Sequence, residues 1–275
     1  LKEPRLQILG ILSVAVSMLI FASLIGYNPN EDPGISPNIL IENPMGILGV
    51  WIGYFFIKLA FGYSSFILPL ITITWGFAVF IGVFIAASIS GAHLNPAVTL
   101  GLAVAGKFSW SLVPSYMLAQ LIGAMLGSWI SYIAYIDHYK EPTEEDIIRS
   151  TFCTGPAIRN FKNNLFAEIL GTFILVFCAL CIVGPNIDIE GISIQNFGLG
   201  SIDALPIGIV VMVIGMGLGG NTGFAINPAR DFGPRLVYSL LPRKNKKPDW
   251  SYSWIPILGP FIGGTFAGIL HILVS

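Results

Sequence analysis

Long apolar runs constrain this chain more than any other feature of its sequence. A helix needs about 20 residues to cross the hydrocarbon core of a bilayer, and runs near that length recur throughout. Charged residues make up only 11% of the 275 residues, whereas a soluble domain has about 25%. We therefore expect a multi-pass membrane protein with spanning helices near residues 7–27, 45–62, 66–89, 110–136, 163–184, 204–219 and 252–274.

The sequence also excludes several classes of function. Its formal net charge of −1 provides no basic surface for a nucleic acid. Cys178 and Cys181 form a CxxC pair inside an apolar run, without a nearby histidine or second cysteine pair, and we assign it no metal or redox role. We find no nucleophile–base pair, so we expect no enzyme, no cofactor and no resident metal.

Glycine spacing and loop charge give two further expectations. Glycines four residues apart on apolar helices favour close helix contact, and three such pairs occur: Gly123 and Gly127, Gly259 and Gly263, and Gly264 and Gly268. Most of the loop charge lies in residues 137–162 and 242–251, which we expect to be solvated connections.

Two shorter apolar pieces, 97–106 and 229–241, each follow a copy of one motif. Ser90-Gly-Ala-His-Leu-Asn-Pro-Ala97 recurs in the second half as Thr222-Gly-Phe-Ala-Ile-Asn-Pro-Ala229. Asparagine is a good helix N-cap and proline suits the first helical position. Each Asn-Pro-Ala therefore predicts the start of a helix too short to cross, and such a helix must be buried in protein or line a cavity.

We predict that these two half-helices enter from opposite faces and meet with their N-termini together. Their positive dipole ends would then converge near the membrane midplane. Asn95 and Asn227 would cap the helices while keeping amide N–H groups free to face a pore. Such a midplane repels cations and orients a passing hydroxyl or water oxygen. The first half-helix would start with Pro96 and Ala97, and the second with Pro228 and Ala229.

Residues 68–275 resemble the major intrinsic protein family, the aquaporins, and most closely its glycerol-conducting branch. The paired Asn-Pro-Ala motifs, Asp231 after Arg230, and Phe166-Ala-Glu168-Ile-Leu-Gly-Thr172 carry this resemblance. It implies an all-α transmembrane fold, a right-handed bundle of six spanning helices plus two re-entrant half-helices from an inverted repeat. It also implies a homotetramer in the plasma (inner) membrane, with one pore per subunit.

The resemblance implies a selectivity filter built from Trp75, Gly215, Phe224 and Arg230. The two aromatic rings would form a corner for the carbon backbone of glycerol, and Arg230 would donate to two hydroxyls. Gly215 would leave room where a histidine narrows the pore to water. Core or lipid-facing packing remains the alternative for the aromatic residues, and a structural ion pair remains the alternative for Arg230.

The resemblance further implies a ladder of backbone carbonyls and two supporting carboxylates. We expect Glu168 to accept N–H bonds from the second re-entrant loop, and Asp231 to support its half-helix. For His93 the sequence leaves the role of the ring open, and a satisfied loop histidine is the simpler interpretation. The ladder would consist of Gly91, Ala92, His93, Leu94, Thr222, Gly223, Phe224 and Ala225.

Residues 1–65 depart from the family, so we divide the chain there. Neither apolar run in this segment contains the glutamate that the family has in its first helix. Residues 8–78, with Tyr27-Asn-Pro-Asn-Glu-Asp-Pro33, resemble the membrane anchor of bacterial septal DNA translocases. Because the family needs one spanning helix before 66–89 and two runs precede it here, either 45–62 does not cross fully or one extra helix packs outside the bundle. A natural fusion, a chimera and a mis-assembled gene all remain open. The channel-like part is 66–275, with its two motifs at 90–106 and 222–241.

The expected function is passive conduction of glycerol and similar small uncharged solutes, with some water. The expected partners are thus a small polyol, water and the lipid bilayer, without nucleic acid. The alternative is a membrane anchor or scaffold whose pore is closed or incomplete. A water-only channel is a third possibility, and Gly215 argues against it.

Overall fold

The structure, a computed structural model, describes residues 67–182, 187–189, 192–194 and 200–275. The predicted runs 7–27 and 45–62, and the translocase-like segment up to residue 66, lie outside these residues. The described helices are α3 (Ile67–Ser90), α4 (Pro96–Val104), α5 (Val113–Ala134), α6 (Glu145–Ser150), α7 (Phe161–Cys181), α8 (Leu205–Thr222), α9 (Pro228–Leu240) and α10 (Ile255–Val274). Short 3-10 turns occur at Trp110–Leu112, His138–Lys140 and Gly200–Ala204.

Five of the described helices, α3, α5, α7, α8 and α10, are long and apolar enough to cross a membrane. They coincide with the predicted spans from residue 66 onward, so the prediction of a multi-pass, all-helical membrane protein is confirmed. One addition was not predicted: between α7 and α8, strand β1 (Ile187–Ile189) pairs antiparallel with β2 (Ile192–Ile194).

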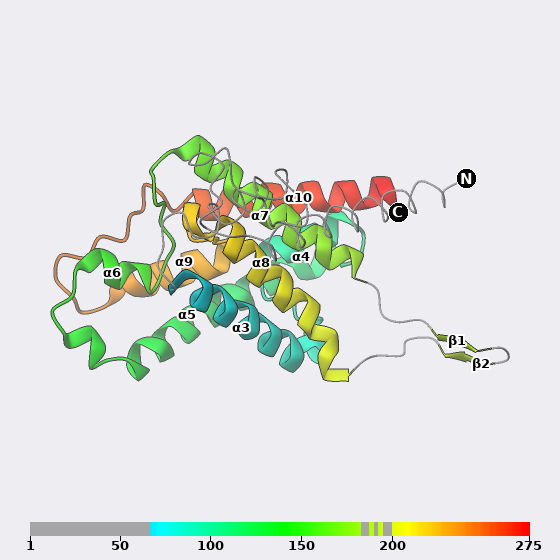
Figure 1. Cartoon of the computed structure of the whole chain (residues 1–275), viewed down its shortest axis with the longest axis horizontal. Helices are drawn as coiled ribbons and strands as arrows, with labels where there is room; N and C mark the ends of the chain where they lie inside the picture. Colours follow the sequence, from blue (N-terminus) through cyan, green and yellow to red (C-terminus); the bar gives the residue numbers. More distant parts are fainter. Residues whose placement is uncertain (1–66, 183–186, 190–191, 195–199) are drawn as a thin grey trace, which may run out of the picture. The chain divides into compact units, whose positions relative to one another are not determined.

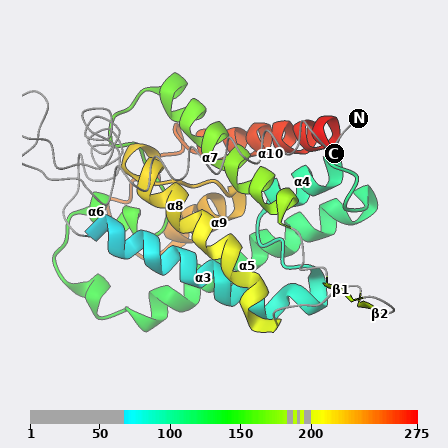
Figure 2. The same cartoon turned by 45° about the vertical axis from the view of Figure 1, so that its right-hand side comes forward.

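The two halves of the chain interlock. Helix α7 lies alongside α10, and α3 lies alongside α8 (Figures 1 and 2). The short helix α4 from the first half packs on α10 from the second half, whereas α9 from the second half packs on α5 from the first. Each half-helix is thus covered by a spanning helix of the other repeat, which buries its backbone as a non-spanning helix requires.

Glycines allow this close packing on α10. A Cβ at Gly263 would lie 2.2 Å from the carbonyl oxygen of Ile169 on α7, and one at Gly264 would lie 2.6 Å from the carbonyl oxygen of Ala97 on α4. Gly259 and Gly268 are equally tight against α7 and α4. The predicted contacts of these two pairs are therefore present. The third pair, Gly123 and Gly127, has no described atom within 4 Å of either Cβ position.

We expect Gly263→Ala to destabilise the protein by about 2 kcal/mol or more, because the added methyl must push α7 and α10 apart. The measurement is the midpoint of thermal unfolding in detergent. Gly217→Ala is the matched control, since nothing lies within 4 Å of that Cβ position, and it should leave the midpoint unchanged or slightly raised. Equal midpoints for both variants would contradict the packing argument.

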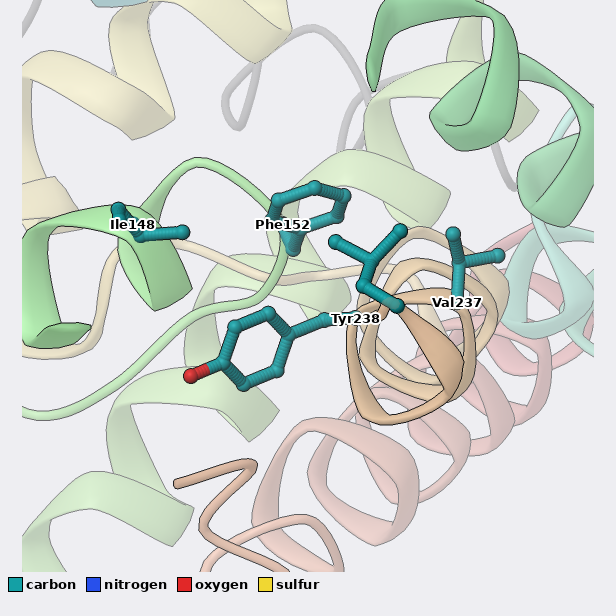
Figure 3. Close-up of a cluster of buried hydrophobic side chains, with 5 residues drawn as sticks. Ile148, Phe152, Val237 and Tyr238 are labelled. Carbon is teal, nitrogen blue, oxygen red and sulfur yellow. The ribbon is translucent and has the colours of Figure 1, made fainter. Parts of the chain in front are cut away.

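The two charged connections are more than solvated loops. Ile148, Phe152, Val237, Tyr238 and Leu241 form a buried cluster that joins α6 and the following residues to α9 (Figure 3). The Tyr238 hydroxyl donates to Glu145 Oε1 at 2.8 Å. Because apolar packing and this hydrogen bond join them to α9, residues 145–152 hold the C-terminal part of that helix in place.

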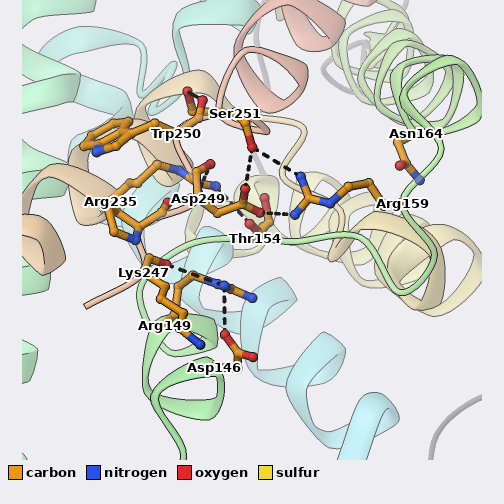
Figure 4. Close-up of polar contacts among 12 residues, drawn as sticks. Asp146, Arg149, Thr154, Arg159, Asn164, Arg235, Lys247, Asp249, Trp250 and Ser251 are labelled. Carbon is orange, nitrogen blue, oxygen red and sulfur yellow. Dashed lines mark hydrogen bonds and ion pairs between the residues drawn. The ribbon is translucent and has the colours of Figure 1, made fainter. Parts of the chain in front are cut away.

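A polar network continues this link toward α10. Arg159 Nη2 lies 2.5 Å from Asp249 Oδ2, and Ser251 donates to Asp249 Oδ1 at 2.9 Å (Figure 4). Burial acts to raise the pKa of Asp249, but the hydrogen bonds from Arg159 and Ser251 outweigh it and hold that pKa below its usual value. The connection before α7 is thereby tied to the one before α10.

Candidate functional site

Each half-helix begins at the asparagine of its motif. Asn95 has extended backbone angles, and its Oδ1 accepts from the N–H of Ala97 at 2.9 Å. Asn227 Oδ1 accepts from Ala229 at 3.0 Å and from Arg230 at 3.2 Å. In both copies the proline follows directly, where a missing N–H has no cost. The sequence therefore fixes both helix starts locally.

The two asparagines face each other. Asn95 Nδ2 donates to the carbonyl oxygen of Ile226 at 2.7 Å, and Asn227 Nδ2 donates to the carbonyl oxygen of Leu94 at 2.9 Å. These reciprocal bonds join the two motifs N-terminus to N-terminus. An amide nitrogen carries two hydrogens, so each side chain uses one of them across the junction and retains one. Of the amide N–H groups predicted to stay free, one on each asparagine is therefore used across the junction.

The residues before each asparagine adopt the same unusual backbone. Positive φ angles occur at the same three positions of the two copies: Gly91, Ala92 and Leu94 in the first, and Gly223, Phe224 and Ile226 in the second. For a residue with a Cβ this conformation costs about 1–2 kcal/mol, so tertiary contacts must hold it. Because the left-handed residues stand at matching positions, the two re-entrant loops share one backbone path.

Glu168 holds the second loop. The residue is 1% exposed, and its carboxylate accepts from Ala225 N at 3.0 Å, from Ile226 N at 2.8 Å and from Thr222 Oγ1 at 2.6 Å. The loop N–H groups are thus directed toward α7.

Trp75 from α3, Phe224 from the second loop and Arg230 from α9 come together. The two rings meet edge to face, with centroids 6.4 Å apart and an interplanar angle of 83°. The Arg230 guanidinium carbon lies 4.4 Å from the centroid of the Trp75 ring. The Arg230 side chain makes no ion pair and no hydrogen bond among the described residues. Its N–H groups therefore donate to no described protein oxygen.

Gly215 has a different position from the one implied for it. It does not line the cavity described below. A Cβ there would lie 2.7 Å from Thr72 Cγ2 and 3.0 Å from the ring of Phe224. The absent side chain therefore makes room for the phenyl ring, which in turn reaches Trp75. Gly215 acts on the site by seating Phe224.

Asp231 pairs with Arg235 and not with Arg230. Both side chains are fully buried, and Arg235 Nε lies 2.8 Å from Asp231 Oδ1. Asp231 Oδ2 also accepts from the backbone N of Thr154 at 2.8 Å and from its hydroxyl at 2.5 Å. Arg235 donates to the carbonyl oxygens of Thr154 and Pro248 (residues 154 and 235 in Figure 4).

Sequence reasoning missed Arg235 and Thr154. The spacing of four residues between Asp231 and Arg235 on one helix is the signal that could have identified the pair. No local signal identifies Thr154, which comes from the connection between α6 and α7.

A cavity of about 330 Å³ runs along these groups. Its lining includes the polar residues Asn95, Asn227 and Arg230, together with residues 91–94 and 224–226, Trp75 and several aliphatic residues. The lining therefore combines hydrogen-bonding side chains with apolar carbon. That combination suits a small solute with one hydroxyl-bearing edge and one hydrocarbon edge.

Comparisons with known proteins all indicate the same family. The model described as Major intrinsic protein matches residues 33–271. The probable glycerol uptake facilitator protein of Thermotoga maritima is 42% identical over 239 residues, which cover 86% of this chain and 90% of that protein. The glycerol uptake facilitator protein of Streptococcus pneumoniae is 44% identical over 204 residues, covering 74% and 82%.

A solved structure supports the fold. The X-ray structure of the aquaglyceroporin from Plasmodium falciparum is similar to this chain with a TM-score of 0.61 and 29% sequence identity, and the match covers 79% of this chain and 87% of that one.

Proposed function

This chain belongs to the major intrinsic protein family, and on that premise we propose that it conducts glycerol and similar small uncharged solutes, with some water, passively across the membrane. It is a channel and not an enzyme. Flux follows the concentration gradient of the solute, without coupling to ions or nucleotides.

The observation that carries the proposal is the junction of Trp75, Phe224 and Arg230 beside the cavity. The aromatic edge-to-face pair presents an apolar corner to the carbon backbone of a polyol. The guanidinium presents several donors in a rigid fork to its hydroxyls. A solute that loses its water there regains both kinds of contact, whereas a purely apolar molecule leaves the donors unsatisfied.

The same arrangement opposes cations. The N-termini of α4 and α9 meet at Asn95 and Asn227, and each helix end carries a partial positive charge of about half a unit. Arg230 adds a full positive charge to the same passage. We propose that the carbonyls of 91–94 and 222–225 accept from the solute along the way, and that the remaining N–H of each asparagine donates to it.

We further propose a homotetramer with one pore per subunit, located in the plasma (inner) membrane. The family membership supports the multi-pass location in a membrane. Cross-linking in native membranes followed by mass determination tests the tetramer, and fractionation of the membranes tests the location.

Purified protein in liposomes is expected to raise glycerol permeability well above that of empty vesicles. The measurement is stopped-flow light scattering after a glycerol gradient is imposed, with water permeability recorded on the same vesicles. A glycerol rate equal to that of empty vesicles would reject the channel and favour the anchor or scaffold. Fast water flux without glycerol flux would favour a water-only channel.

A further inference from the structure

We infer that Thr154 is a positioning residue of the proposed selectivity filter. Its hydroxyl holds Asp231, and its side chain packs against Gly223. These two residues directly adjoin Arg230 and Phe224, so Thr154 sets the separation between the guanidinium and the phenyl ring. The inference rests on the proposed function and deepens it, because it identifies a residue outside the filter that makes the channel prefer small polyols to larger ones.

The first contact joins Thr154 to α9. The Thr154 hydroxyl donates to Asp231 Oδ2 at 2.5 Å, and its backbone N–H donates to the same oxygen at 2.8 Å. In return, Arg235 Nη2 donates to the Thr154 carbonyl oxygen at 2.9 Å. Thr154 and Asp231 are both buried, and hydrogen bonds to a charged group away from bulk water are strong. They fix the first turn of α9, which carries Arg230.

The second contact joins Thr154 to the second re-entrant loop. A Cβ on Gly223 would lie 3.3 Å from both Cβ and Cγ2 of Thr154, so the threonine packs directly against the glycine backbone. Three residues further along the same connection, the Ala157 N–H donates to the carbonyl oxygen of Asn221 at 3.0 Å. The connection between α6 and α7 is therefore fixed to the residues immediately before Phe224.

The two contacts together determine the geometry of the filter. Phe224 belongs to the loop and Arg230 to α9, and each stands one residue from a contact with Thr154. Both line the cavity of about 330 Å³, so on that side they meet space and not protein. Their separation therefore depends on how their backbones are held. A binding site stays selective only when its groups are held within about 0.5 Å.

The first motif has no counterpart of this contact among the described residues. The residue four positions after its asparagine is Thr99, whose hydroxyl oxygen lies 3.1 Å from His93 Nδ1 and 2.9 Å from Gln120 Nε2. At Gly91, only the ring of His93 lies within 4 Å of the Cβ position. The first loop thus packs on its own histidine and on α5. The contact with Thr154 is found at the loop that carries the filter.

The test is the ratio of glycerol permeability to xylitol permeability, measured by light scattering on the same proteoliposomes. Both rates scale with the number of folded channels, so their ratio reports the filter and not the yield. Thr154→Val removes the hydroxyl at nearly constant shape, and we expect the ratio to fall about threefold to tenfold. A hydrogen bond to a charged group contributes about tenfold or more, but the backbone N–H of Thr154 still donates to Asp231 in this variant.

Two variants serve as controls. Thr154→Ser retains the hydroxyl and the Cβ, hence both contacts, and should preserve the ratio. Thr151→Val makes the same chemical change three residues earlier, where the hydroxyl bonds to Ile148 and Tyr139 and not to α9, and should leave the ratio unchanged. If Thr154→Val yields no folded protein, Thr154→Ala removes the hydroxyl without placing a methyl group against the carboxylate, and the same fall is expected.

A merely structural role for Thr154 would lower both permeabilities in proportion. An unchanged ratio in the folded Thr154→Val or Thr154→Ala variant would therefore overturn the inference, while the channel stands. An equal fall in Thr154→Ser would also overturn it, because that variant retains the hydroxyl. If the unsubstituted protein carries no glycerol, the proposed function itself fails, and this role fails with it.

Discussion

Asp231→Ala is expected to lower the free energy of unfolding by about 3–5 kcal/mol, the cost of leaving a buried charge without its partner. Arg235 is fully buried, and Asp231 is its carboxylate partner at 2.8 Å. The substitution also removes the acceptor for both hydrogen bonds from Thr154. The measurement is thermal unfolding in detergent, together with the yield of folded protein.

Asp146→Ala is the matched control for that result. Asp146 pairs with Arg149 at 3.0 Å, but its side chain is 62% exposed, and exposed pairs contribute about 0–1 kcal/mol. The control should therefore unfold close to the unsubstituted protein. An equally small effect for Asp231→Ala would show that the buried pair is not what fixes α9.

Arg230→Ala is expected to increase the permeability of a small monovalent cation such as methylammonium on the order of 100-fold. A unit positive charge about 4–5 Å from a passing cation opposes it by roughly 3–4 kcal/mol at the effective dielectric constant of a partly buried site. Arg230 makes no ion pair among the described residues that would neutralise it. Discrimination between glycerol and larger polyols should fall in the same variant.

These fluxes are measured on proteoliposomes, with uptake of labelled methylammonium and light scattering for the polyols. Arg149→Ala removes the same charge from α6, away from the cavity, and should alter neither flux. If Arg230→Ala still excludes methylammonium, the barrier to cations does not lie at Arg230. The converging ends of α4 and α9 would then supply it.

Some parts of the site could be predicted because they depend on local chemistry. Asn-Pro-Ala begins a helix in either copy, since the asparagine caps the first turn and the proline lacks the N–H that the turn leaves unpaired. The described spans could be located because their apolar length must match the bilayer. The positions of α4 and α9 follow within two residues from these two rules.

Other parts could not be predicted because they depend on contacts between distant segments. Ala92, Leu94, Phe224 and Ile226 have no intrinsic preference for a left-handed backbone. For the second loop, Glu168 and the Asn95 bond to Ile226 supply the contacts that hold it. Similarly, the sequence suggested pore space at Gly215, whereas its neighbours show that it accommodates the ring of Phe224.

The sequence by itself determined the membrane class, the spans from residue 66 onward and the two half-helix starts, because capping and apolar length act within one helix. Only the tertiary structure decided which groups meet: Asn95 with Ile226, Asp231 with Arg235 and Thr154, and His93 with Thr99 and Gln120. The reason is that hydrogen bonds of buried side chains are set by the packing of helices far apart in sequence, and no local pattern specifies that packing.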